Sequence, residues 1–221
     1  MDGMSVESRC PLCGGEARRG AATDMLGRRL GECGTCGLVF AEERDWPDAA
    51  AEKARYGLHR NSAADGGYVR FLRRTLEPAL RRLPPGGRML DFGSGPSPVL
   101  AELARAAGAR CEAWDPFFAP ERPEGAFDVV TACEVVEHFH RPRESWADLL
   151  GFAGKRGTAV VATEVLGEDL SGMGRWSYAG DFTHTAFYRE RTLRWIADRW
   201  GRRLETVEAG RVYAFEVDGA G

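Results

Sequence analysis

Four cysteines near the N-terminus have the spacing that points most directly to a chemical role. They form two Cys-x-x-Cys pairs with nineteen residues between the pairs: Cys10, Cys13, Cys33 and Cys36. Each pair aims two thiolates at one point, and two pairs complete the tetrahedral ligand set of a structural Zn²⁺ site. Because the protein would fill all four coordination positions, the expected zinc is structural and not catalytic. The segment between the pairs suits a small β-hairpin, so we expect a zinc ribbon.

Carboxylates and imidazoles gather at a second point, directly after an apolar run that predicts a strand. Glu134, Glu137 and His138 have helical spacing, so one helical turn would place them on the same side. The later segment WSYAGDFTHTAFY adds Asp181 and His184. Such groups perform general acid–base chemistry, and imidazole does so most often because its pKa lies near neutrality. We therefore expect the reactive groups of the protein here.

A glycine turn in the middle of the chain predicts a ligand-binding crevice. Residues 88–100 read RMLDFGSGPSPVL, which is a short apolar strand, a break at the glycines and the start of a helix. Strand, glycine turn and helix N-terminus form the nucleotide-binding crevice of doubly wound α/β sheets. Asp115 follows Asp91 by 24 residues and ends the next apolar run. A carboxylate in that position can accept hydrogen bonds from both hydroxyls of a ribose.

Length, composition and charge limit the class of protein. A chain of 221 residues is long enough for one α/β domain with a small appendage. It has no apolar run as long as a membrane span, and MDGMSVESRC does not resemble a secretory signal. Six cysteines without such a signal indicate a reducing cytoplasm, where disulfides are not expected. A net charge of −3 argues against a general nucleic-acid-binding protein.

The stretches LDFGSGPSPVL, AWDPFF and FDVVTACEVVEHFHRP together resemble the class I S-adenosylmethionine (SAM) dependent methyltransferases, from about residue 56 to the C-terminus. The chain differs from the usual glycine loop because Pro96 and Ser97 replace its later glycines. A dinucleotide dehydrogenase fits less well, since its pyrophosphate needs the third glycine. The residues expected to bind SAM on this resemblance are Asp91, Gly93, Ser94, Gly95, Asp115, Pro116, Phe117, Glu134 and Tyr68.

The resemblance implies an α/β fold with a Rossmann-like, mostly parallel sheet and a terminal antiparallel hairpin. Apolar patterns predict strands at 89–92, 110–114, 127–133 and 158–163, and the closing hairpin at 202–208 and 211–217. Helices are expected at 68–83, 99–107, 142–153 and 189–200. Only about a dozen residues separate Asp115 from the strand at 127, too few for a helix and another full strand. We therefore expect the sheet to lack its usual third strand.

These patterns divide the chain into three parts. We expect a zinc ribbon over residues 1–41, a helical connector and lid over 42–86, and a SAM-binding methyltransferase domain over 87–221. In the connector, His59, Asn61 and Tyr68 are candidates for contact with SAM or the acceptor. His140 is expected at the surface. The arginines between residues 70 and 82 are expected to form a solvated helix face, called the arginine face below. Anion binding by this face is the minority interpretation.

The pattern ExxEH with a distant histidine resembles the metal site of small-RNA 2′-O-methyltransferases and of quinone-biosynthesis O-methyltransferases. On that resemblance, a second divalent metal would be held by Glu134, Glu137, His138 and His184. Such an ion would lower the pKa of an acceptor hydroxyl and orient it. Two other interpretations stay open: His184 as a base without metal, and a purely structural role for the cluster.

We therefore expect a methyltransferase that transfers a methyl group from SAM to a hydroxyl or amine of a small molecule. The expected catalytic residues are His184, Glu137 and His138. An RNA methyltransferase that uses the ribbon and the arginine face to hold RNA is one alternative. A catalytically silent protein that docks on a partner through the same fold is the other.

Overall fold

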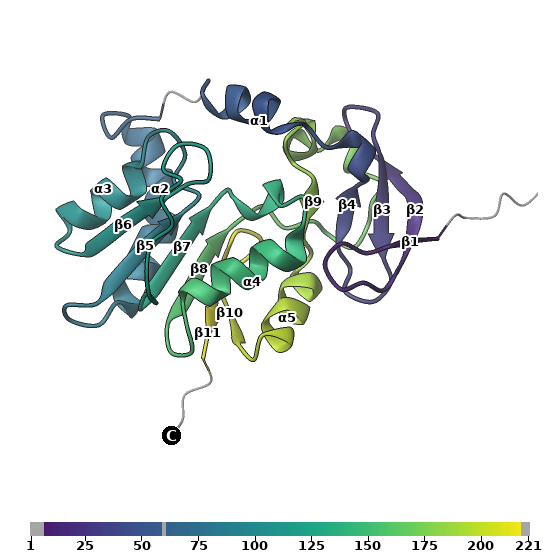
Figure 1. Cartoon of the computed structure of the whole chain (residues 1–221). Helices are drawn as coiled ribbons and strands as arrows, with labels where there is room; N and C mark the ends of the chain where they lie inside the picture. The colour runs from purple at the N-terminus through teal and green to yellow at the C-terminus, as the bar shows by residue number, and fades with distance from the viewer. Residues whose placement is uncertain (1–6, 59–60, 218–221) are drawn as a thin grey trace, which may run out of the picture.

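The larger of the two sheets has six strands in the order β10-β11-β8-β7-β5-β6 in the computed structural model, which describes residues 7–58 and 61–217 (Figure 1). Strands β6, β5, β7 and β8 are parallel, and the terminal hairpin adds β11 and β10 in antiparallel orientation. The six strands are β5 (Arg88–Phe92), β6 (Arg110–Trp114), β7 (Val129–Cys133), β8 (Thr158–Ala162), β10 (Arg203–Glu208) and β11 (Val212–Glu216). This confirms the expected Rossmann-like arrangement.

Strand β6 is the edge of this sheet, so the expected absence of a third strand is confirmed for the described residues. After β6 the chain makes a tight turn in which Asp115 and Ala119 form an isolated antiparallel bridge. A parallel crossover needs a dozen or more residues, and this segment is too short to make one and then add a strand. The Arg105 Nε donates a hydrogen bond to the Cys111 carbonyl at 2.8 Å, which occupies part of the open edge.

Alternate residues of the central strands face two separate hydrophobic layers, as period-two geometry requires. Met89 and Val129 face the layer that contains α2 (Gly66–Arg82) and α3 (Val99–Ala106). Leu90 and Val130 face the layer that contains α4 (Pro142–Phe152) and α5 (Glu190–Arg199). Figure 1 shows the helices on both sides of the sheet. The helices therefore cover strands that are buried on both faces, which explains their continuous apolar runs.

Two of the arginines of α2 form ion pairs with carboxylates of the terminal hairpin. Arg74 pairs with Glu208, and Arg82 pairs with both Glu205 and Glu216. Their charges are thus compensated by glutamates within the same domain. The structure therefore agrees better with a solvated helix face than with a surface for binding anions.

The second sheet has five strands in the order β1-β2-β3-β4-β9 and contains the ribbon. Its strands are β1 (Glu7–Arg9), β2 (Glu16–Thr23), β3 (Arg29–Cys33), β4 (Val39–Ala41) and β9 (Ala186–Phe187). Strands β2 and β3 form the antiparallel hairpin expected between the two cysteine pairs. Strand β9 comes from the second half of the chain and pairs with β4. The ribbon's sheet therefore includes a strand from beyond residue 41, the boundary that the sequence predicts.

The remaining short elements lie between the ribbon and the large sheet. Helix α1 (Ala49–Tyr56) crosses the top of the view in Figure 1, and the 3₁₀ turns are η1 (Glu43–Asp45), η2 (Val136–His138), η3 (Met173–Arg175) and η4 (Ser177–Gly180). Asp48 caps α1 by accepting a hydrogen bond from the Ala51 N–H at 2.8 Å, directly after Pro47. No helix among the residues that the structure describes has both the length and the apolar character needed to cross a membrane.

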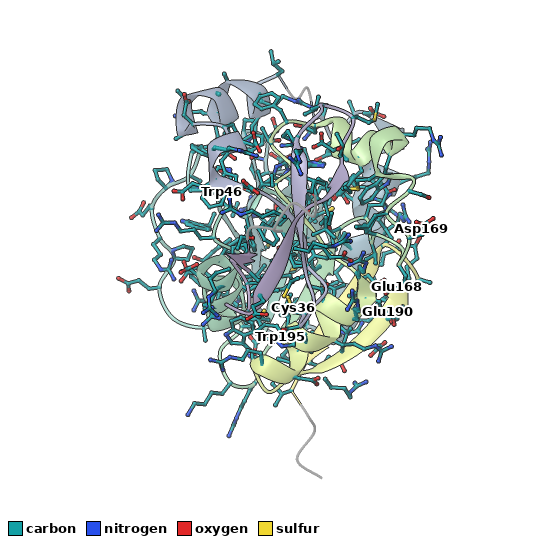
Figure 2. All side chains as sticks on the ribbon, turned by 90° about the vertical axis from the view of Figure 1, so that its right-hand side faces the viewer. Cys36, Trp46, Glu168, Asp169, Glu190 and Trp195 are labelled. Atoms are coloured by element: carbon teal, nitrogen blue, oxygen red, sulfur yellow. The ribbon has the colours of Figure 1, made fainter. Side chains whose placement is uncertain are left out.

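The ribbon and the large sheet share one hydrophobic core. Leu12, Leu38 and Cys36 belong to the same buried cluster as Trp146 of α4 and Leu193 of α5. Figure 2, which faces the ribbon, shows Cys36 at its lower end, near the helix that carries Trp195. Burial of apolar surface contributes roughly 25 cal/mol per Å² to stability, so this shared core ties the two parts together.

The guanidinium of Arg189 connects the same two parts by hydrogen bonds. Its side chain is 1% exposed and lies 2.8 Å from a carboxylate oxygen of Glu32 in β3. One of its NH groups donates to the Gly37 carbonyl at 2.9 Å, and its Nε donates to the Gly167 carbonyl at 3.1 Å. A buried charge needs such partners because unpaired it would cost several kcal/mol.

We expect Arg189→Met to lower the free energy of unfolding by about 3–5 kcal/mol, because it leaves two carbonyls and one of the two carboxylate oxygens of Glu32 without their donor. Arg191→Met is the matched control. The Arg191 side chain is 43% exposed and, like that of Arg189, forms ion pairs with Glu32 and Glu168. Exposed pairs contribute at most about 1 kcal/mol. Urea unfolding followed by circular dichroism measures both values, and equal losses in the two variants would contradict this prediction.

Candidate active site

A cavity of about 1060 Å³ opens at the carboxyl ends of β5 and β7. The glycine loop, residues 93–97, forms one wall. Residues of α1 and of the segment between β4 and α1 form the opposite side. Ligand sites of α/β sheets lie at this end of the strands, and cavities that hold ligands measure roughly 300–1000 Å³. The volume is therefore sufficient for two ligands side by side.

Two glycines shape the loop, each for a different reason. Gly93 has φ +73°, and a Cβ there would lie 2.6 Å from the Val135 side chain. Gly95 has φ +66° and lines the cavity, and a Cβ there would meet nothing within 4 Å. Left-handed backbone favours glycine at both positions. Gly93 thus allows β5 and the segment after β7 to approach, and Gly95 leaves room for a ligand.

Asp115 holds this loop in place through its carboxylate. One oxygen accepts a hydrogen bond from the Gly95 N–H at 2.9 Å, and the other accepts from the Phe117 N–H at 2.8 Å. The residue is 6% exposed and does not line the cavity. Both oxygens of Asp115 are thus bonded to backbone, and its expected contact with a ribose stays a prediction.

Asp91 lines the cavity with a buried carboxyl group. Burial raises its pKa to about 7, although the Thr131 hydroxyl and the charge of Arg105 act in the opposite direction. Burial disfavours the charged form of a carboxyl group, so the group gains or loses its proton near neutrality. A ligand cation in the cavity would stabilise the charged form.

Aromatic and polar residues complete this half of the cavity. Pro116, Phe117 and Tyr68 line it as expected, together with Ser94 of the loop. Tyr68 comes from α2, and burial raises its pKa above the ordinary tyrosine value. Asn61 also lines the cavity. The candidate His59 lies outside the described residues.

Glu137, His138 and His184 come together at the other side of the cavity. Their ligand atoms lie within 4.8 Å of one another, and the two imidazole centroids are 4.7 Å apart. The Nδ1 of His138 lies 3.1 Å from the Thr183 carbonyl, and the Nδ1 of His184 lies 2.6 Å from the Tyr178 carbonyl. A carbonyl only accepts hydrogen bonds, so the Nδ1 of each ring carries a proton, and in the neutral form of His184 the lone pair lies on Nε2.

Glu134 is not one of the residues whose ligand atoms converge there, although its charge contributes to the raised pKa of Glu137 after burial. It leaves β7 with φ +54°, an uncommon conformation for a residue other than glycine, and the 3₁₀ turn η2 begins only at Val136. Its carboxylate accepts a hydrogen bond from Arg211 at 3.1 Å. The expected single helical turn over Glu134–His138 therefore differs from the observed backbone, although Glu134 still lines the cavity.

The side chain of Glu137 is fully buried and does not line the cavity. One of its oxygens accepts a hydrogen bond from the Thr163 hydroxyl at 3.0 Å, and burial raises its pKa to about 8. Its main-chain carbonyl accepts a hydrogen bond from the Thr185 N–H at 2.8 Å. Glu137 thus links η2 to β8 and to the segment that carries His184.

Among the residues that line the cavity and that the sequence did not identify as site residues are Trp46, Glu52, Tyr56 and His140. The Trp46 ring stacks on His140 with centroids 5.0 Å apart. A carboxylate oxygen of Glu52 lies 3.3 Å from the Nε2 of His140 and accepts a hydrogen bond from the Tyr56 hydroxyl at 3.1 Å. The spacing of Glu52 and Tyr56 at i and i+4 was the only local signal, and it did not show that α1 crosses the cavity.

The aromatic residues around His184 divide between core and rim. Phe187 and Tyr188 are fully buried, as core packing requires, and Tyr178 is half-buried with its hydroxyl bonded to Thr163. None of the three lines the cavity. The aromatic side of the cavity comes instead from Trp46, Tyr56 and Phe117.

The four ribbon cysteines form a compact group at the opposite end of the ribbon from this cavity. Their sulfur atoms all lie within 4.8 Å of one another, with Cys10–Cys36 at 3.6 Å and Cys13–Cys33 at 3.3 Å. Thiolates around a tetrahedral zinc lie roughly 3.8 Å apart, given Zn–S bonds of about 2.3 Å. The Gly15 and Cys36 N–H groups donate to the sulfurs of Cys13 and Cys33. The donor set and its spacing fit zinc.

Comparison with known proteins places this geometry in context. Residues 62–207 match the family model described as a methyltransferase domain. No curated protein is significantly similar in sequence to this chain.

Solved structures share the fold. A chain of the Haloferax volcanii complex between the Trm112 methyltransferase activator and its partner is 12% identical over 78% of this chain and 96% of that one, with a TM-score of 0.51. An O-methyltransferase family protein from Burkholderia thailandensis is 14% identical over 77% and 64%, with a TM-score of 0.50. An O-methyltransferase family 2 protein from Planctomyces limnophilus in complex with apigenin is 17% identical over 78% and 62%, with a TM-score of 0.50. At these identities the similarity shows the fold alone.

We expect Gly93→Ala to destabilise the protein more than Gly95→Ala. Both replacements place a side chain in left-handed backbone, which costs about 1–2 kcal/mol. Only the Cβ at position 93 also meets another side chain, which adds about 1–3 kcal/mol for overpacking. The free energy of unfolding in urea measures the difference, and a greater loss in Gly95→Ala would contradict the assigned roles.

Proposed function

The chain belongs to the methyltransferase-domain family, and from this premise we propose that it transfers a methyl group from SAM to a hydroxyl or amine of a small molecule. One observation carries the proposal. The imidazoles of His138 and His184 line the same cavity as the glycine loop, and the Tyr178 carbonyl binds the Nδ1 of His184, so that Nε2 is the basic nitrogen of that ring. A cofactor site and a base thus share one space, as methyl transfer to a protic acceptor requires.

The cavity wall fits SAM. When bound, SAM supplies a methyl group that its sulfonium sulfur has already activated. The carboxylates of Asp91 and Glu134 line the cavity and complement a cationic ligand, and Pro116 and Phe117 offer apolar surface to adenine. The open space beside Gly95 allows the backbone to approach the ligand. Asp115 contributes by holding Gly95 and Phe117 in position.

His184 has the properties of a general base. Burial lowers its pKa below the ordinary histidine value, so that the ring is neutral at pH 7. The Tyr178 carbonyl holds its Nδ1 proton, which leaves Nε2 to take a proton from the acceptor. Removal of that proton makes the acceptor oxygen or nitrogen a better nucleophile, and a positioned base of this kind contributes about 10²–10⁴-fold to a rate.

A small-molecule acceptor agrees with the surroundings of the base. Trp46, Tyr56 and Glu52 line the cavity beyond the histidines and give that end aromatic and acidic character. A phosphate backbone would need free cations, whereas Arg74 and Arg82 of the α2 face pair with glutamates. RNA is therefore the less favoured acceptor.

Metal-assisted transfer is a second candidate, supported by the close approach of Glu137, His138 and His184. Carboxylate and imidazole ligands suit Mn²⁺, Fe²⁺ or Zn²⁺. The burial of Glu137 away from the cavity favours the base without metal, because a catalytic metal needs a position open to the acceptor.

We also propose that the four cysteines of the ribbon bind one zinc ion. The close approach of the sulfurs and the N–H donors to Cys13 and Cys33 support this site. All four ligands come from the protein, so the role of the zinc is to stabilise the ribbon.

Binding of S-adenosylhomocysteine tests the cofactor site. We expect its affinity to rise about tenfold from pH 6 to pH 8, because the ligand's ammonium group favours the charged form of Asp91, whose pKa is about 7. Affinity is thus present above that pKa and lost as pH falls through it. Isothermal titration calorimetry with wild type and Asp91→Asn checks this, since the variant should bind more weakly and without this pH dependence.

Absence of S-adenosylhomocysteine binding at every pH would contradict the proposed function. It would favour the alternative of a catalytically silent protein with the same fold. Binding that is equally dependent on pH in Asp91→Asn would instead assign the titration to another group.

A Mn²⁺ titration of the zinc-loaded protein, saturated with S-adenosylhomocysteine, separates the two mechanisms. We expect paramagnetic resonance to show no saturable Mn²⁺ site in wild type or in Glu137→Gln, because Glu137 is closed off from the cavity. One saturable site in wild type that Glu137→Gln loses would overturn the metal-free mechanism. It would then favour acceptors with chelating hydroxyls.

A further inference from the structure

The turn between the ribbon strands β2 and β3 reaches the segment that carries His184. Asp24 and Arg28 in this turn form a buried ion pair, with the Arg28 Nε 2.6 Å from a carboxylate oxygen of Asp24. The side chains of Asp24 and Arg28 are 0% and 9% exposed. The other Asp24 oxygen accepts hydrogen bonds from the Leu26 and Arg28 N–H groups at 2.9 Å each. The turn thus holds the guanidinium in one orientation before it contacts anything else.

The same guanidinium binds the main chain on both sides of Thr183. One NH group donates to the Phe182 carbonyl at 2.9 Å, and the other donates to the His184 carbonyl at 3.0 Å. A planar guanidinium with three of its corners engaged fixes direction as well as distance. Arg28 therefore determines where the backbone of His184 lies relative to the ribbon.

Other contacts hold the rest of this segment. The ring of His184 bonds to the Tyr178 carbonyl, and Asp181 pairs with Arg55 of α1 at 2.6 Å. The Thr185 carbonyl accepts a hydrogen bond from the Ala41 N–H of β4 at 2.9 Å. Two of the contacts on the main chain of residues 182–185 thus come from Arg28 and one from another part of the ribbon.

We propose that Arg28 is a positioning residue for His184, and that the ribbon thereby forms part of the active site. The proposal rests on the proposed function, in which His184 is the base. It gives the ribbon a role beyond stability, because the main chain at His184 is held by a side chain whose own orientation depends on the ribbon's turn. A base must lie within hydrogen-bond distance of its proton, so a displacement of about 1 Å costs up to 10²-fold in rate.

The charged and aromatic groups that face His184 come from every neighbouring element. Asp181 raises its pKa, whereas Arg28 and Arg55 lower it in addition to burial. The centroid of the His184 ring lies 4.7 Å from that of His138 and 4.3 Å from that of Tyr178. Loss of Arg28 therefore removes one positive charge and one constraint on the backbone, while the other four groups stay.

Nuclear magnetic resonance of histidine ring nitrogens tests the proposal without an acceptor. The chain has four histidines, and the spectrum of His184→Gln assigns the signal of His184. In wild type we expect a single tautomer with the proton on Nδ1, which the Tyr178 carbonyl accepts. In Arg28→Ala we expect a mixture of tautomers, because the backbone that carries the ring is released.

Two further variants separate positioning from charge and from unfolding. Arg28→Lys keeps the cation but cannot bind both carbonyls, so we expect mixed tautomers in this variant as well. Arg29→Ala is the matched control from the same hairpin, and its exposed side chain predicts a wild-type spectrum. Zinc content and the thermal midpoint of each variant show whether the ribbon stays folded.

A His184 signal in Arg28→Ala and Arg28→Lys identical to that of wild type, in folded protein, would overturn the proposal. So would an equal change in Arg29→Ala. The readout needs neither SAM nor methyl transfer, so a failure of S-adenosylhomocysteine binding would reject the proposed function and leave this result to be judged separately.

Discussion

The buried guanidinium of Arg189 is the interaction on which the arrangement of this protein depends. It sits at the start of α5, directly after β9, and binds a glutamate of β3, the carbonyl after the last ribbon cysteine and the loop after β8. A charge buried to this extent is tolerated only when each donor has a partner. The ribbon, the large sheet and the segment between β8 and α5 must therefore adopt one mutual position. The hydrophobic core that the ribbon shares with α4 and α5 supports that position.

The active site follows from the same constraint. The segment that ends at Arg189 contains β9, which pairs with β4 of the ribbon, and His184 just before it. Arg28 from the ribbon, Tyr178 from η4 and Glu137 from η2 then hold the residues around His184. The candidate base thus lies between the ribbon and the cofactor half of the cavity. The ribbon contributes to the site by its contacts with the main chain and keeps its cysteines for a separate metal site.

Buried carboxyl groups divide between binding and support. Asp91 faces the cavity with a pKa raised to about 7, so a cationic ligand changes its charge near neutral pH. Glu137 has a pKa raised to about 8 by burial, but it faces Thr163 and the interior. Similar burial therefore has different consequences, because only one of the two groups reaches the cavity. Glu134 lies between these cases, at the cavity wall but paired with Arg211.

The sequence by itself determined the local elements. Apolar periodicity gave the strands from β5 to β11 of the large sheet to within two residues at each end, and the short connection after Asp115 predicted the missing third strand. The spacing of Cys10, Cys13, Cys33 and Cys36 predicted their convergence, and the glycine turn located the cavity. These features depend on residues close together in the chain, whose periodicity and turn chemistry can be read directly.

Only the tertiary structure decided which distant residues meet. It paired β4 with β9, directed Arg28 to the His184 carbonyl 156 residues away, and placed Trp46 against His140. It also left Glu134 outside the group formed by Glu137, His138 and His184, because the left-handed backbone at Glu134 interrupts the helical spacing that the sequence suggests. The hydrophobic periodicity of a segment indicates whether it is a helix or a strand, but not which distant residues it contacts. Those contacts arise when the buried charges and the shared core fix the ribbon against the sheet.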